Sequence, residues 1–151
     1  MNKDLKLSES GRALIKDKEV FSSTWYLCPA KKMTIGWGHV KESGDNFNHI
    51  DENRGNELLD WDCKEAIDCI KKYVKVPLTQ NQFDALVVFV FNIGIGAFQT
   101  STVLRKLNAG DLLGSAKGFA LFNKITVKGK KQVCNGLVKR RAEEAALFLK
   151  L

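Results

Sequence analysis

The sequence has no apolar run long enough to cross a membrane. The longest run covers residues 85–91, which is seven residues, whereas a membrane-spanning helix needs about 20. Residues 1–4 lead into no apolar core of the kind that a secretory signal peptide carries. We therefore expect no stable membrane insertion and no signal peptide.

Cysteine and histidine are also scarce. No two cysteines form a CxxC pair, so a structural zinc site is not expected, and we expect free thiols instead of a disulfide framework. The two histidines, His39 and His49, have no acidic residue at ligand spacing, so we expect no metal site and no cofactor. The cysteines are Cys28, Cys63, Cys69 and Cys134.

The charge balance is basic, with 24 basic and 17 acidic residues and a formal net charge of +7. Such an excess favours an anionic partner, namely nucleic acid, a membrane surface or an acidic envelope polymer, or it reflects only a solvated surface. No helix-turn-helix or zinc-finger pattern is present, so we do not expect nucleic-acid binding. Residues 124–141 contain basic residues and no acidic one, which predicts a basic face.

The N-terminal third combines a helix with a small sheet. Ser8 can cap a helix that runs to about Lys18, with Ala13, Leu14 and Ile15 among its buried positions. Residues 21–40 alternate aromatic and small residues as a hairpin or small sheet does. A polar loop follows over residues 40–49 and turns at residues 44–46.

Helices dominate after residue 51. Asp51 can cap a helix through Leu58, and Thr79 with Gln82 forms a capping box before a helix that is apolar on nearly all faces. A basic loop is expected at residues 124–131, and the final helix carries the pairs Lys139/Glu143 and Arg140/Glu144. The expected helices after the first cover residues 51–58, 59–73 (with Trp61, Ala66, Ile67 and Ile70 as apolar positions), 80–91, 101–107, 111–123 and 135–149.

These elements predict an α+β fold that is mainly helical. We expect one domain over residues 1–151, in which a small β-hairpin lobe of about residues 12–58 is joined by a helix to a helical bundle lobe of about residues 74–151. The N-terminal helix is expected to dock on the bundle. A cleft between two such lobes suits an extended substrate.

Three polar residues near the small sheet are candidates for chemistry. Glu19 follows the C-terminus of the first helix, where the helix dipole disfavours a carboxylate, so its pKa should rise as a general acid requires. Position alone, however, favours an ordinary surface glutamate at a frayed helix end. Thr34 can hold a water molecule or serve as an ordinary strand residue. His39 can be a base or ligand, or can support the hairpin by local hydrogen bonds.

Three segments resemble the catalytic region of phage-type lysozymes: residues 15–19, residues 26–30 (Tyr-Leu-Cys-Pro-Ala) and residues 34–39 (Thr-Ile-Gly-Trp-Gly-His). In that family a glutamate ends the first helix, an aspartate follows nine residues later and a threonine six residues beyond. Glu19 and Thr34 match this pattern, whereas Cys28 stands in place of the aspartate. The resemblance continues in order through residues 77–86, 91–98, 104–111 and 136–144.

The resemblance implies a lysozyme-like fold and a glycoside hydrolase of the lysozyme class, that is, an endolysin or muramidase. Such an enzyme hydrolyses the β-1,4 bond between N-acetylmuramic acid and N-acetylglucosamine in bacterial peptidoglycan and causes lysis of the host cell. Glu19 would be the general acid, and Cys28 and Thr34 would complete the catalytic set. The Cys28 thiolate could act as base, nucleophile or electrostatic partner, or the side chain could only pack, with Thr34 alone placing the water. Inversion is the family expectation, and the cysteine leaves the outcome open.

The expected glycan contacts follow the apolar helix. Amide, hydroxyl and aromatic side chains there suit a polysaccharide, and the candidates are Asn92, Phe98, Ser101 and Asn123. The partner is peptidoglycan, and we expect a monomer that stays in the host cytoplasm until a holin-like membrane pore releases it to the cell wall. Two alternatives remain: a catalytically silent wall-binding protein, suggested by Cys28, and a basic nucleic-acid binder, suggested by charge alone.

Overall fold

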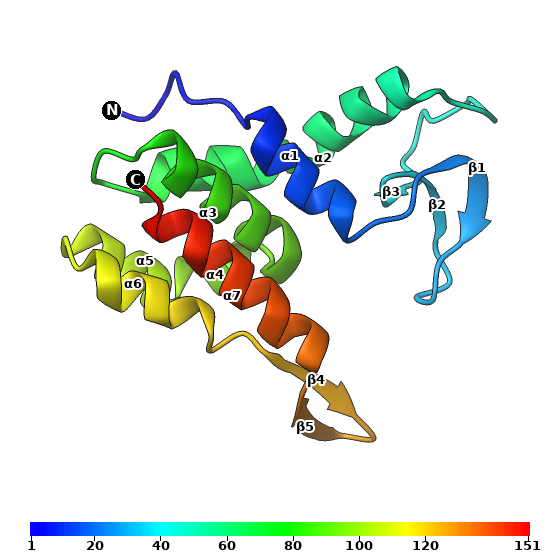
Figure 1. Ribbon diagram of the computed structural model, residues 1–151. Helices are drawn as coiled ribbons and strands as arrows, with labels where there is room; N and C mark the ends of the chain where they lie inside the picture. Colours follow the sequence, from blue (N-terminus) through cyan, green and yellow to red (C-terminus); the bar gives the residue numbers. More distant parts are fainter. The chain divides into compact units, whose positions relative to one another are not determined.

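The computed structural model describes all residues, Met1–Leu151. Helices alternate with two small antiparallel sheets, which confirms the expected α+β class (Figure 1). The chain forms two compact units, here called the β unit (Arg12–Lys64) and the helical unit (Met1–Gly11 with Glu65–Leu151). The elements are α1 (Glu9–Asp17), β1 (Ser22–Leu27), β2 (Met33–Gly36), β3 (His39–Val40), α2 (Glu52–Tyr73), α3 (Gln80–Ile93), α4 (Ile95–Gln99), α5 (Thr102–Asn108), α6 (Leu112–Phe119), β4 (Lys124–Val127), β5 (Lys130–Val133) and α7 (Asn135–Leu149).

The β unit contains the sheet that the sequence predicted. Its order is β1-β2-β3, and Tyr26 pairs with Thr34 in the antiparallel register of the first two strands. The buried side chains Ile35, Ile50 and Leu58 form the core of this unit. Aromatic side chains cover that core because a small sheet buries enough apolar area only when a neighbouring layer packs on it; they are Phe21, Trp25 and Phe47.

Both predicted caps at the starts of α1 and α2 are confirmed. The Gly11 amide donates to Ser8 Oγ at 3.2 Å, and the Arg54 amide donates to Asp51 Oδ1 at 2.8 Å. Each contact satisfies an amide that has no partner within its own helix.

Three expectations for these helices were wrong. α2 is one continuous helix and not two, because no proline or glycine interrupts the pattern after Gly55. Ala13 is exposed, although Ile15 two residues later is buried. Trp61, one of the expected apolar positions, is 58% exposed.

α3 forms the centre of the helical unit. The Thr79–Gln82 capping box is present in both directions, and every residue from 83 to 90 is buried. α3 packs against α7, and α6 packs against α5 and α7 (Figure 1). Phenylalanine rings meet edge to face in this core, where they bury a large apolar area; they are Phe89, Phe119, Phe122 and Phe148.

Several details of the helical unit differ from expectation. The expected basic loop is the β4–β5 hairpin, whose turn is made by Lys128 and Gly129, both at positive φ. Such φ values suit a two-residue hairpin turn. α6 ends at Phe119 and not near residue 123, and α4 was not expected at all. No helix is both long and apolar enough to span a membrane.

Candidate active site

Glu19 lies directly after α1, and its carboxyl group rests against the backbone of the link between β2 and β3. The Glu19 amide donates to the Lys16 carbonyl at 3.1 Å, which continues the helical turn. A β-carbon placed on Gly38 would lie 3.3 Å from both Cδ and Oε2 of Glu19. Gly38 has a φ of +86°, which disfavours any other residue. This glycine therefore allows the carboxyl group its position.

Cys28 and Thr34 meet at the turn end of the β1–β2 hairpin. The Cys28 amide donates to the Lys32 carbonyl at 3.0 Å. Hydrogen bonds from the Lys32 amide and the Thr34 hydroxyl lower the pKa of the Cys28 thiol. Thr34 is 3% exposed. Its hydroxyl group lies 2.9 Å from the Lys32 carbonyl oxygen, to which it can donate its single proton instead. Cys28 is a free thiol and is only half-buried.

Tyr26 lies close enough to both Cys28 and Glu19 to interact with their charges. Partial burial and then the negative charges of Glu19 and Cys28 raise the pKa of its hydroxyl. The structure thus places Glu19, Cys28 and Thr34 around one hairpin. Tyr26 and Gly38 belong to the same arrangement, and neither was predicted as a site residue. Tyr26 pairs with Thr34 across the strands, so strand register is the signal that could have found it.

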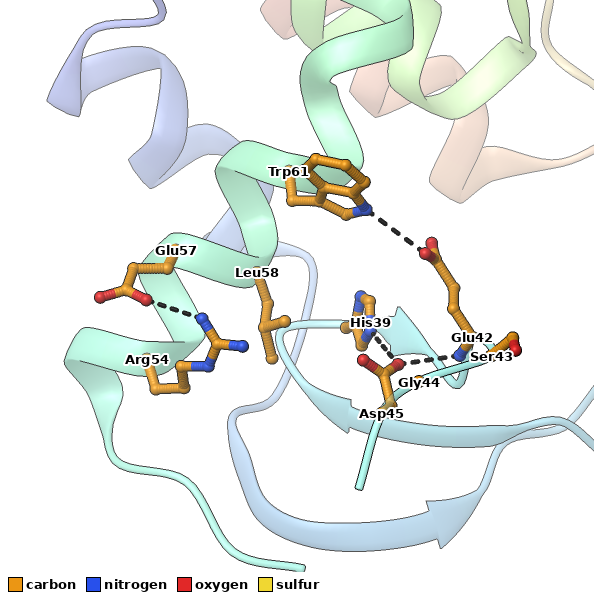
Figure 2. A pocket seen from close by; sticks show the side chains of 9 residues that line it. All are labelled: His39, Glu42, Ser43, Gly44, Asp45, Arg54, Glu57, Leu58 and Trp61. Carbon is orange, nitrogen blue, oxygen red and sulfur yellow. Dashed lines mark hydrogen bonds and ion pairs between the residues drawn. The ribbon is translucent and has the colours of Figure 1, made fainter. Parts of the chain in front are cut away.

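His39 is a buried structural residue. Its ring lies between two carboxylates, with Nδ1 at 2.9 Å from Asp62 and Nε2 at 2.9 Å from Asp45. Figure 2 shows the contact with Asp45. Burial lowers its pKa, but the hydrogen bonds to Asp45 and Asp62 outweigh burial, and the pKa of His39 lies above its ordinary value. Support of the hairpin is therefore confirmed. The expectation of no acidic partner was wrong, because Asp62 comes from α2, far along the chain.

The carboxylates around His39 respond differently to their surroundings. Burial raises the pKa of Asp62, and the His39 ring offsets this only in part. For Asp45, hydrogen bonds from the Glu42 amide and from His39 outweigh burial and lower its pKa. Ligand atoms of His39, Glu42 and Asp62 lie within 4.8 Å of one another, close enough to hold a metal ion. Both ring nitrogens already lie within hydrogen-bond distance of carboxylates, however, so the ring fits a structural contact better than a metal ligand.

Of the four side chains predicted to contact the glycan, two are buried and two are accessible to solvent. Phe98 is fully buried, and Ser101 Oγ donates to the Phe98 carbonyl at 2.7 Å and accepts from the Leu104 amide at 3.1 Å as the cap of α5. Neither side chain can meet a sugar. Asn92 is exposed near the end of α3, and Asn123 is half-buried before β4.

Arg141 holds the Asn92 side chain. Arg141 and Glu144 are 1% and 2% exposed, and Nε lies 2.8 Å from Oε1 in an ion-pair contact, while Nη2 donates to Oε2 at 3.1 Å. The same Nη2 donates to Asn92 Oδ1 at 2.7 Å. The expected partner of Glu144 was Arg140, and that pairing was wrong. Burial raises the pKa of Glu144 to about 7. Arg141 therefore does not contribute to the expected basic face.

Comparison with known proteins decides the family. A model of the phage lysozyme family matches residues 16–144. The chain belongs to the phage lysozyme family. This lysozyme is 41% identical to the endolysin of Acyrthosiphon pisum secondary endosymbiont phage 1, over 94% of the chain and 97% of that relative. As a lysozyme it is a glycoside hydrolase.

Solved structures agree with this assignment. The endolysin from Escherichia coli O157:H7 phage FAHEc1 is 38% identical, with a TM-score of 0.88 over 97% of this lysozyme and 94% of that chain. The muramidase domain of SpmX from Asticaccaulis excentricus is 36% identical, with a TM-score of 0.87 over 97% of this lysozyme and 99% of that domain. The lysozyme-like fold implied by the sequence is therefore confirmed.

Proposed function

We propose that the chain hydrolyses the β-1,4 bond between N-acetylmuramic acid and N-acetylglucosamine in bacterial peptidoglycan, with Glu19 as general acid. The observation that carries the proposal is the grouping of Glu19, Cys28 and Thr34 around one hairpin. Relatives named endolysin and muramidase support the choice of peptidoglycan. A carboxylic acid and a second group that handles water are what glycoside hydrolysis requires.

Glu19 supplies the proton in this scheme. Its protonated carboxyl group donates to the glycosidic oxygen as the bond to the anomeric carbon breaks, and the leaving sugar departs as an alcohol. The position after α1 favours the protonated form, because the helix C-terminus repels negative charge. Gly38 provides the space in which the carboxyl group stays fixed.

Cys28 and Thr34 handle the water. The Thr34 hydroxyl orients a water molecule, whose oxygen attacks the anomeric carbon while its proton passes to the Cys28 thiolate. The lowered pKa of the Cys28 thiol increases the fraction of thiolate at neutral pH. Attack from the face opposite the leaving oxygen inverts the anomeric centre.

Asn92 and Asn123 are the remaining candidates for contact with the glycan. Because Arg141 occupies Oδ1 of Asn92, the two N–H donors of the amide are left for an acceptor such as an acetamido carbonyl. We also propose that the enzyme acts as a monomer and reaches the wall from the host cytoplasm through a holin-like pore. Host lysis is the expected result.

Mass spectrometry of fragments released from purified peptidoglycan tests the proposal. Wild type should release fragments with N-acetylmuramic acid at the reducing end, and Glu19→Gln should lose about 10²- to 10⁴-fold of that activity. Anhydro termini would identify a lytic transglycosylase. If neither protein released fragments and both sedimented with the wall, the silent wall-binding alternative would replace the proposal.

A further inference from the structure

A pocket of about 350 Å³ opens on the β unit, and none of the three catalytic candidates lines it. Its volume is in the range of small-ligand sites. Figure 2 shows its walls, which come from the loop after β3 and from the first turns of α2. The lining residues are His39, Glu42, Ser43, Gly44, Asp45, Arg54, Glu57, Leu58 and Trp61.

Trp61 gives the pocket an apolar wall. Its side chain is 58% exposed, although tryptophan is usually well buried. The indole Nε1 donates to Glu42 Oε2 at 3.3 Å, which orients the ring (Figure 2). Leu58 at the same pocket is 5% exposed. The pocket therefore combines an oriented aromatic face with a small apolar floor.

The charged groups of the pocket are largely paired with one another. Arg54 donates to Glu57 at 2.7 Å, and Asp45 accepts from His39 and from the Glu42 amide, the latter at 2.8 Å. Paired charges leave hydrogen-bonding atoms at the rim but little net attraction for an ion. The lining thus suits a neutral, polar ligand.

We propose that this pocket is a second, non-catalytic saccharide subsite that binds one N-acetylhexosamine ring of a glycan strand. The apolar C–H face of the pyranose packs on the Trp61 indole, where burial of apolar area stabilises the contact. Hydroxyl groups at the ring edge donate to the Glu42 and Glu57 carboxylates, and Arg54 donates to a sugar oxygen. The identity of the polymer as peptidoglycan rests on the proposed function, whereas the pocket itself does not.

Indole N–H resonances of the inactive Glu19→Gln protein test binding directly. The chain has three tryptophans and therefore three indole N–H signals. The signal that disappears in Trp61→Phe is that of Trp61. On titration with an N-acetylglucosamine tetramer, the Trp61 signal should shift progressively. The Trp25 indole is a useful internal reference, since it donates to the Phe47 carbonyl at 2.7 Å. A Trp61 signal that stays unmoved while other resonances saturate would overturn the proposal.

Retention on purified peptidoglycan sacculi provides the second measurement, again in the Glu19→Gln background. Trp61→Ala and Arg54→Gln should each weaken retention about tenfold, the loss expected for one stacking or charged hydrogen-bonding contact. Leu121→Ala is the matched control, because Leu121 is 65% exposed and does not line the pocket. Equal retention of Trp61→Ala and the control would overturn the subsite.

The two proposals fail in different ways. Lack of fragment release by the wild type would reject the hydrolytic function while the tetramer still shifted the Trp61 signal. Normal fragment release together with an unmoved Trp61 signal would reject only the subsite.

Discussion

The Nη2 group of Arg141 donates to the Oδ1 atom of Asn92 at 2.7 Å, and so a fully buried cation sets the orientation of an exposed amide. The guanidinium group is itself held by Glu144 and lies over the Phe89 ring, 5.2 Å from its centroid. This arrangement presents N–H donors, and not an acceptor, to anything that contacts Asn92.

Asn92→Asp should therefore weaken substrate binding. The new carboxylate keeps the contact with Arg141 but offers no donor, and loss of one hydrogen bond should raise KM about tenfold with kcat nearly unchanged. Steady-state kinetics on soluble glycan oligomers measures the two constants. Unchanged kcat/KM would mean that Asn92 does not contact the substrate.

Gly38→Ala should reduce turnover through Glu19. The added methyl group would meet the Glu19 carboxyl at 3.3 Å, and a displaced catalytic group can cost about 10²-fold in rate. The backbone penalty at positive φ is about 1–2 kcal/mol. Gly110→Ala is the matched control, because its φ is +82° with no atom within 4 Å of the added methyl. Equal activity of both variants would separate Gly38 from the catalytic group.

The pH profile tests Cys28. If its thiolate accepts the proton from water, activity should rise with pH through the Cys28 pKa, which lies below its ordinary value of 9.0. Cys28→Ser should lower kcat and abolish this limb. Thr34→Val should lower kcat and move the limb to higher pH, because the hydrogen bond from the Thr34 hydroxyl lowers the Cys28 pKa. Unaltered turnover and stability of Cys28→Ser would assign the thiol a packing role only.

His39 should stabilise the fold in a pH-dependent manner. Its folded pKa lies above 6.5, so its contribution is fully present below that value and is lost as pH rises through the folded pKa. His39→Gln should lower the free energy of unfolding by about 1–3 kcal/mol near pH 6, and by less near pH 9. Urea denaturation at both values measures this, with the exposed His49→Gln as control. A penalty that grew with pH would contradict the ion-pair assignment.

Local signals in the sequence were sufficient for most helix boundaries. The Thr79–Gln82 box and the Ser8 cap depend on residues three apart, and both formed as expected. Glu19 and Thr34 could be named because the family pattern preserves their spacing. Phe98 could not be recognised as a core residue, because the sequence pattern of an aromatic residue beside a glycine-rich helix break is the same whether its side chain is exposed or buried.

Long-range contacts account for what was missed. His39 meets Asp62 across 23 residues, and Arg141 meets Asn92 across 49. No periodicity links such positions, because their approach depends on how the elements pack. The β4–β5 hairpin was missed for a different reason: its lysines mask the strand alternation that Ile125 and Val127 carry.

That hairpin has a consequence for how the protein behaves at high concentration. Both strands of a two-stranded sheet are edge strands. Each presents unpaired N–H and C=O groups, with which a strand of a second copy could pair to extend the sheet. Every residue of the hairpin is exposed except Val127, which is partly covered. The exposed residues include four lysines: Lys124, Lys128, Lys130 and Lys131. Like charges on two approaching hairpins repel, so the lysines disfavour edge-to-edge aggregation.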